Sequence, residues 1–219
     1  MLTIHHADLL LPGAGREPVP GGAVLVEGRT VAAAGPYEEL AAARPTARVR
    51  RWPGVITPGL RNPYGPELLE RAYHPDPREA GELGTEPLTG EALAALEMTD
   101  VRWGASARRG VQRMLAHGTV AVAGELRRHA VLEAVTRAGL GVEERFTDPP
   151  GPPTFDLFAG GRPVAEAFTP PPLSRTGRDA DFAVFAVPTD GDPYAALAEH
   201  GAVTCVATVL AGRLVHRRR

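Results

Sequence analysis

Two segments near opposite ends of the sequence repeat one pattern, and this repeat limits the possible folds more than any other feature. Residues 24–31 and 208–215 each consist of an apolar run, a Gly-Arg pair and a second apolar run. Glycine tolerates the positive φ angle of a tight turn, so each pattern predicts a β-hairpin. Hairpins at both ends, with helical patterns between them, predict one β domain built from both termini and interrupted by an insertion.

The middle of the chain contains a run typical of an α/β layer. Apolar side chains recur at helical spacing in residues 103–117, and Gly118 then suits a helix C-cap. Residues 119–123 are rich in β-branched side chains, residues 126–138 form an amphipathic helical pattern, and residues 140–146 can form the next strand. This strand–helix–strand order predicts a β-α-β unit and therefore a parallel pair of strands.

The remaining segments give weaker patterns. Residues 37–43 are predicted to be helical and residues 47–56 to form a strand, whereas residues 62–90 are predicted to be irregular because proline and glycine are frequent there. Residues 155–158 and 163–168, on either side of two glycines, are predicted to form a further hairpin. Residues 182–187 are predicted to form a strand.

Three segments resemble the metal-dependent amidohydrolase superfamily in their order and spacing. They are residues 54–62 (GVITPGLRN), residues 178–185 (RDADFAVF) and the closing hairpin. Imidazolonepropionases and aminodeoxyfutalosine deaminases are the most similar subgroups. The resemblance implies an α+β fold: a β-sandwich composite domain from residues 1–58 plus 178–219, and an incomplete TIM-barrel remnant in residues 59–177.

The sequence departs from that family where the metal should bind. In the family the Pro-Gly-Leu-x-Asn segment precedes a His-x-His motif, whose imidazoles share one strand face and chelate a metal. Tyr64 and Pro66 occupy those positions, and the chain has no lysine that could be carbamylated. About 118 residues separate Leu60 from Asp179, fewer than the roughly 200–250 of a complete barrel. From these departures we expect no catalytic residue, no metal and no cofactor.

The other ionisable residues suggest no replacement site. His5 and His6 are adjacent on a predicted strand and should face opposite sides, and the remaining histidines are scattered. Asp179 and Asp181 are expected to have turn roles. Asn62 and Tyr64 remain as candidate ligand-pocket residues. The pocket that corresponds to the family's active site could still bind a small molecule there.

Composition restricts the partners and the location that we expect. The formal net charge is −2, which favours neither nucleic acid nor an anionic membrane as a partner. No apolar window reaches the length of a membrane span and no signal peptide is recognisable, so we expect a cytoplasmic protein. All basic side chains counted as Lys+Arg are arginines, which suggests a GC-rich bacterial genome. A truncated barrel would expose apolar surface, so we expect a homodimer or a partner protein.

These observations lead to two functional hypotheses. The leading one is an amidohydrolase-like, imidazolonepropionase-like pseudoenzyme with a binding or assembly role. The alternative is a divergent hydrolase of non-peptide C–N bonds, such as a cyclic amide hydrolase or a deaminase. One structural prediction follows from Pro63 and Pro66, which lack backbone N–H donors: the first barrel strand should end at about Arg61, and residues 62–66 should form a loop with Tyr64 over the former metal site.

Overall fold

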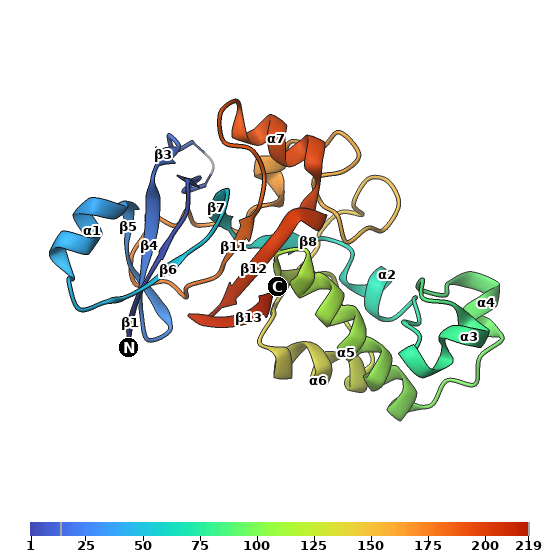
Figure 1. Ribbon diagram of the computed structural model, residues 1–219. Helices are drawn as coiled ribbons and strands as arrows, with labels where there is room; N and C mark the ends of the chain where they lie inside the picture. Colours follow the sequence, from blue (N-terminus) through green and yellow to red (C-terminus); the bar gives the residue numbers. More distant parts are fainter. Residues whose placement is uncertain (14, 219) are drawn as a thin grey trace. The chain divides into compact units, whose positions relative to one another are not determined.

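The computed structural model describes residues 1–13 and 15–218, which divide into two compact units. Unit 1 comprises Met1–Arg61, Leu115–Val120 and Asp156–Arg219, and unit 2 comprises Asn62–Met114 and Ala121–Phe155. Figure 1 shows that the blue N-terminal strands and the red C-terminal strands belong to the same unit. The fold is mixed α+β with three sheets, and the described residues form no closed barrel.

The first sheet of unit 1 has the strand order β5-β4-β1-β6. Its strands are β1 (Leu2–His6), β4 (Gly22–Glu27), β5 (Thr30–Pro36) and β6 (Arg48–Arg51). β4 and β5 form the predicted N-terminal hairpin, in which Gly28 has a φ of 59°. The predicted helix at residues 37–43 is confirmed as α1 (Tyr37–Ala43). β1 pairs antiparallel with β4 and parallel with β6, so β6 is an edge strand.

The second sheet of unit 1 has the order β13-β12-β11-β7-β2-β3. Its strands are β2 (Leu9–Leu10), β3 (Val19–Pro20), β7 (Val55–Pro58), β11 (Phe182–Phe185), β12 (Cys205–Leu210) and β13 (Arg213–Arg217). β7 pairs antiparallel with β11, so strands from the two ends of the chain lie side by side. β12 and β13 form the predicted C-terminal hairpin, with positive φ angles at Ala211 and Gly212.

Residues of both sheets share one hydrophobic core in unit 1. Val24 and Val26 from the first sheet belong to the same buried cluster as Ile56, Phe182 and Val184 from the second. Alternate side chains of a strand point to one face, so each sheet contributes its inward-facing positions to this cluster. Strands from both ends of the chain therefore share one sheet, and residues of both sheets share one core.

Unit 2 is mainly helical and carries the predicted β-α-β unit. The elements from residue 60 to residue 143 are β8 (Leu60–Asn62), α2 (Gly65–Leu69), η1 (Pro77–Glu79), α3 (Ala80–Leu83), α4 (Gly90–Ala94), α5 (Asp100–Ala116), β9 (Thr119–Ala123), α6 (His129–Ala138) and β10 (Gly141–Glu143). Of these residues, 60–61 and 115–120 belong to unit 1. The strand order of this sheet is β10-β9-β8. β9 and β10 are parallel and flank α6, as the sequence predicts. α6 buries Val131 and Val135 and ends at Gly139 in the left-handed conformation.

Three short helical elements complete the fold in unit 1. They are η2 (Val164–Ala167), α7 (Pro193–His200) and η3 (Ala202–Thr204). Asp192 caps α7, because its carboxylate accepts a hydrogen bond from the backbone N–H of Tyr194. Among the described residues, no helix combines the length and the apolar composition that crossing a membrane requires.

The hairpin predicted for residues 155–158 and 163–168 is wrong. This region contains bends and the 3-10 helix η2, and no strand. The Asp156 carboxylate accepts hydrogen bonds from the backbone N–H groups of Phe158 and Ala159, and this local turn removes donors that a strand ladder would need. A carboxylate cap therefore decides the local structure in place of the apolar pattern.

Three other boundaries also differ from the prediction. The strand predicted at residues 47–56 is divided into β6 and β7, because Gly54 adopts a φ of 73° between them. The helix predicted from residue 126 begins only at His129. Residues 62–90 contain α2, η1 and α3 where an irregular segment was predicted. Asp76 and Glu79 form a capping box at η1, and such caps can hold short helices in a sequence of weak periodicity.

Candidate functional site

The segment where the family resemblance places a metal site is a turn followed by a helix. β8 extends to Asn62 and α2 begins at Gly65, so the predicted loop at residues 62–66 is correct only for the two residues between them. The Asn62 Oδ1 accepts a hydrogen bond from the backbone N–H of Tyr64 at 2.9 Å, which forms a local turn. Pro66 lies in the first turn of α2, where its missing N–H leaves no helical hydrogen bond unmade.

The two candidate pocket residues are buried and hold neighbouring backbone. The Asn62 side chain is fully buried, and its Nδ2 donates to the carbonyl oxygen of Thr154 at 3.0 Å. Tyr64 is 1% exposed, and its hydroxyl donates to the carbonyl oxygen of Pro150 at 2.6 Å. Both hydrogen bonds join the first residues of unit 2 to residues 150–154 near its end. Neither residue lines the pocket described below, so their ligand-binding role stays a prediction.

Restoring the family's two histidines should not restore a metal site. Two residues at i and i+2 share one face only in a strand, whereas Tyr64 and Pro66 span the junction from a turn into α2. We therefore expect the double variant Tyr64→His/Pro66→His to contain no stoichiometric zinc, iron or manganese by elemental analysis. The unaltered protein, loaded and desalted in the same way, is the control. Stoichiometric metal in the double variant alone would contradict this expectation.

The histidines and the two aspartates of the returning strand have separate structural partners. His5 and His6 face opposite sides as predicted: His5 accepts from the Trp52 indole N–H, and His6 lies beside Tyr37. Asp179 forms two hydrogen bonds with the Arg29 guanidinium, and these bonds lower the pKa of that carboxyl. Over residues 1–13 and 15–218, no three His, Cys, Asp or Glu side chains come together as a candidate metal group.

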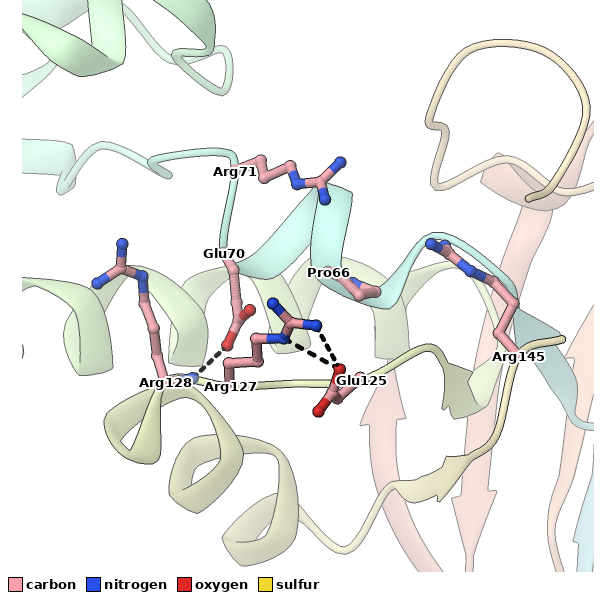
Figure 2. Close-up of a pocket in the computed structure, with 7 residues that line it drawn as sticks. All are labelled: Pro66, Glu70, Arg71, Glu125, Arg127, Arg128 and Arg145. Atoms are coloured by element: carbon pink, nitrogen blue, oxygen red, sulfur yellow. Dashed lines mark hydrogen bonds and ion pairs between the residues drawn. The ribbon is translucent and has the colours of Figure 1, made fainter. Parts of the chain in front are cut away.

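An arginine-rich pocket in unit 2 is the strongest candidate for a functional site. Its volume is about 550 Å³, within the usual range for small-molecule pockets. Figure 2 shows the residues that line this arginine pocket, which are Pro66, Glu70, Arg71, Glu125, Arg127, Arg128 and Arg145. In this view Arg128 and Arg145 stand at opposite ends of the row, with Glu70, Arg127 and Glu125 between them.

The arginine pocket lies where chain segments leave the strands of the three-stranded sheet. Pro66 follows β8, Glu125 and Arg127 follow β9, and Arg145 follows β10. In open α/β sheets, ligands bind beyond the carboxyl ends of the strands, because the connecting loops there bring side chains from separate segments together. The position of the pocket in the chain is therefore the one that α/β architecture favours for a binding site.

Arg145 is the best-held arginine of the pocket. Its side chain is 15% exposed and forms two hydrogen bonds with the Glu67 carboxylate, at 2.9 and 3.1 Å. It also donates to the carbonyl oxygen of Pro63. Burial favours the neutral form of Glu67, but the hydrogen bonds and charge of Arg145 outweigh it, so the pKa of Glu67 is lowered. The Arg145 guanidinium is thus fixed in position before any ligand arrives.

The carboxylates of the pocket are occupied by protein partners. Glu125 accepts two hydrogen bonds from Arg127, at 2.8 and 3.0 Å. Glu70 accepts from the backbone N–H of Arg128 at 2.6 Å, at the start of α6. The Arg128 guanidinium lies over the Trp103 ring at 4.4 Å from its centroid, a cation–π contact. These contacts fix the carboxylates, while Arg71 and Arg127 remain largely exposed, at 73% and 79%.

The arginine side chains of the pocket suit an anion. Four arginines and two glutamates line it, an excess of two positive charges, which Glu67 and Asp148 offset where they pair with Arg145. Arginine stays protonated in proteins and presents a planar fork of donors that matches carboxylate and phosphate oxygens. The arrangement can therefore bind and orient a small anion. The sequence analysis missed this site, and the Arg127-Arg128 pair in the first turn of the predicted helix was its only local signal.

Comparison with known proteins finds similarity by structure only. No family model matches the sequence, and no curated protein matches it. The structure is similar to solved structures of hydrolases and deaminases over about 65% of the chain. Examples are A. niger ochratoxinase (21% identity, TM-score 0.44, 65% of this chain and 31% of that one), Helicobacter pylori aminofutalosine deaminase (14%, 0.43, 66% and 33%) and triazine hydrolase from Arthobacter aurescens (16%, 0.45, 65% and 35%). This chain therefore spans about a third of the length of those proteins.

Proposed function

We propose that this chain is an amidohydrolase-like protein that binds a small anionic molecule in the arginine pocket and does not hydrolyse it. The amidohydrolase-like part of the proposal rests on the motifs at residues 54–62 and 178–185. The two sheets of unit 1, with their shared core, correspond to the β-sandwich that these motifs imply. The observation that carries the binding role is the convergence of four arginines after three neighbouring strands.

Two features favour binding over acid–base chemistry at this site. The positions that correspond to the family's first metal ligands have structural roles here. Tyr64 donates a hydrogen bond to a backbone carbonyl, and Pro66 lies in the first turn of α2. In the arginine pocket, the carboxylates of Glu70 and Glu125 accept hydrogen bonds from protein donors. A general base needs an oxygen within reach of the substrate proton, and one oxygen of each of these carboxylates already accepts from the protein.

The proposal assigns a ligand class to the pocket. The largely exposed guanidinium groups of Arg71 and Arg127 match a molecule with one or two carboxylate or phosphate groups. The aliphatic stems of the arginines and the ring of Pro66 add apolar surface for its carbon skeleton. A compact organic acid or phosphorylated metabolite fits both features.

Calorimetry with citrate and with inorganic phosphate tests this proposal, and neutral glucose serves as the blank. Hydrogen bonds to charged groups contribute about 1.5–3 kcal/mol each, so Arg71→Gln and Arg128→Gln should each weaken binding about tenfold or more. Arg137→Gln is the matched control, because Arg137 lies exposed on α6 and pairs with Glu133 outside the pocket. Unchanged binding by the Arg71→Gln/Arg128→Gln double variant would refute the binding site.

The absence of hydrolysis needs a separate test, since a binding site and a reaction can fail independently. We expect the purified protein to release no ammonia from cyclic amides or aromatic amines after incubation with zinc, iron or manganese salts. Turnover that depends on one of these metals would support the alternative, a divergent hydrolase of non-peptide C–N bonds. Turnover that Glu70→Gln alone abolishes would place such a reaction in the arginine pocket.

The expected assembly with a second copy or a partner chain also stays a prediction. Light scattering at micromolar concentration measures the mass in solution directly. A mass of twice that of the chain, 23.1 kDa, would support a homodimer, and a clean monomer would contradict it.

A further inference from the structure

Unit 1 carries a second group of arginines that the proposed function does not use. Arg48 and Arg50 lie two residues apart on the edge strand β6, and Trp52 follows at the same spacing. Side chains at i, i+2 and i+4 of an extended strand point to one side. Arg217 of β13 joins them from the other sheet, because its guanidinium lies over the Trp52 ring at 5.7 Å from the centroid. We call Arg48, Arg50 and Arg217 the β6 arginine cluster.

Among the described residues, no carboxylate lies within ion-pair distance of the β6 arginine cluster. Ion pairs are found for Arg29, Arg102, Arg109 and other arginines, but none for the three cluster members in the part of the chain that the structure describes. Partial burial and the positive charges of Arg48 and Arg217 lower the pKa of the Arg50 guanidinium. Like charges held close together destabilise one another, so an anion from solution would relieve this repulsion.

We propose that the β6 arginine cluster is a binding site for a small ligand with adjacent phosphate groups, such as an oligophosphate chain. Three guanidinium groups on one side of two strand edges supply several N–H donors to a compact polyanion. Residues two apart on a strand are separated by about 6.6 Å, a span that a short phosphate chain can bridge. This site lies in unit 1 and is independent of the arginine pocket of unit 2.

The surroundings of Trp52 favour a small ligand over single-stranded nucleic acid. Proteins that bind single strands stack bases on open aromatic faces next to a basic groove. The Trp52 ring is stacked with His5 at 6.1 Å between centroids, and Arg217 lies over it. Its indole N–H also donates to His5. The indole donor and one ring face are therefore engaged within the protein, which leaves less of the ring to a base than an open aromatic platform would.

Calorimetric titration of the full chain with inorganic tripolyphosphate tests the proposal. The Arg71→Gln/Arg128→Gln background removes a contribution from the arginine pocket. We expect saturable binding in that background, and at least tenfold weaker binding after Arg50→Gln or Arg217→Gln. Arg213→Gln is the matched control, because Arg213 is exposed on the same strand β13 but outside the cluster; it should bind as the background does. Binding should also weaken as salt rises from 50 to 200 mM, because salt screens exposed charges.

Three outcomes would overturn the proposal. The first is an absence of tripolyphosphate binding in the background protein at low salt. The second is equal binding by the folded Arg50→Gln/Arg217→Gln variant, with folding checked by circular dichroism. The third is tighter binding of a single-stranded oligonucleotide than of tripolyphosphate, which would assign the cluster to nucleic acid. Failure of citrate binding in the arginine pocket would leave this result unaffected, because the two sites use different residues.

Discussion

Replacing Gly54 by alanine is expected to destabilise unit 1 by at least about 3 kcal/mol, the range of severe single substitutions. Gly54 has a φ of 73°, which L-residues with a side chain rarely adopt. A Cβ atom at this position would overlap the carbonyl oxygen of Phe185 and approach the backbone N–H of Val187 to 2.9 Å. These atoms belong to backbone, so no side-chain rotation can relieve the overlap.

Two glycine controls separate the causes of this effect. Gly28 has a φ of 59° but open space around it, so Gly28→Ala should cost only the strain of the left-handed conformation, about 1 kcal/mol. Gly35 has neither a positive φ nor a neighbour within 4 Å, so Gly35→Ala should change stability little. Urea unfolding of the three variants measures the free energies. Equal values for Gly54→Ala and Gly28→Ala would show that the backbone overlap is absent.

Gly54 also illustrates where sequence patterns determine the fold and where they do not. The hairpins at both ends could be predicted because alternating apolar residues and a glycine turn are local features. The division of residues 47–56 into β6 and β7 was missed, although Pro53-Gly54 is a turn-favouring pair. The close approach of the Phe185 backbone to Gly54 joins residues too distant in the sequence to leave a periodic signal.

The short helices also could not be predicted from the periodicity of the sequence. α5 was predicted from its length and spacing, and it forms as expected. α2 has five residues and η1 has three, too few to show a helical period. They depend on particular contacts, such as the capping box between Asp76 and Glu79. Sequence analysis finds long amphipathic helices, whereas short capped ones need the tertiary structure.

The functional site was harder to predict than the fold. The sequence directed attention to Asn62 and Tyr64 because the family resemblance marks those positions, and both prove to be hydrogen-bonded to backbone. The arginine pocket depends instead on Arg145 meeting Glu67, which is 78 residues away. Arginines in loops are common and usually solvated. That four of them line one pocket could be recognised only from the three-dimensional structure.

Acidification below about pH 6.5 is expected to destabilise unit 1 through His5. The side chain is 2% exposed, and burial, with a smaller effect of the Arg50 charge, lowers its pKa from 6.5 to about 3. Its Nδ1 accepts a hydrogen bond from the Trp52 indole N–H, so protonation would remove that acceptor. Phe182 packs edge-on against the ring and offers no compensating charge. The folded protein therefore holds His5 neutral over a pH range in which the unfolded chain protonates it.

The sign and size of the effect follow from proton linkage. Between pH 6.5 and about 3 the unfolded state binds one more proton at this residue, so the free energy of unfolding falls as pH falls. The slope is about 1.4 kcal/mol per pH unit, and the whole range amounts to a loss on the order of 5 kcal/mol. Burial also lowers the pKa of His74, which further decreases the free energy of unfolding as pH falls. A comparison of the unaltered protein with His5→Asn is needed to separate the two histidines.

Asparagine keeps an acceptor near the Nδ1 position but does not titrate. His5→Asn should lower stability at neutral pH, because the ring packing against Trp52 and Phe182 is lost, yet its stability should fall less steeply on acidification. The measurement is urea unfolding of both proteins at half-unit intervals from pH 7.5 to 4. Parallel curves for the two proteins would show that His5 takes up its proton in the folded state as readily as in the unfolded one. A flatter curve for His5→Asn would assign the difference in slope to this one imidazole.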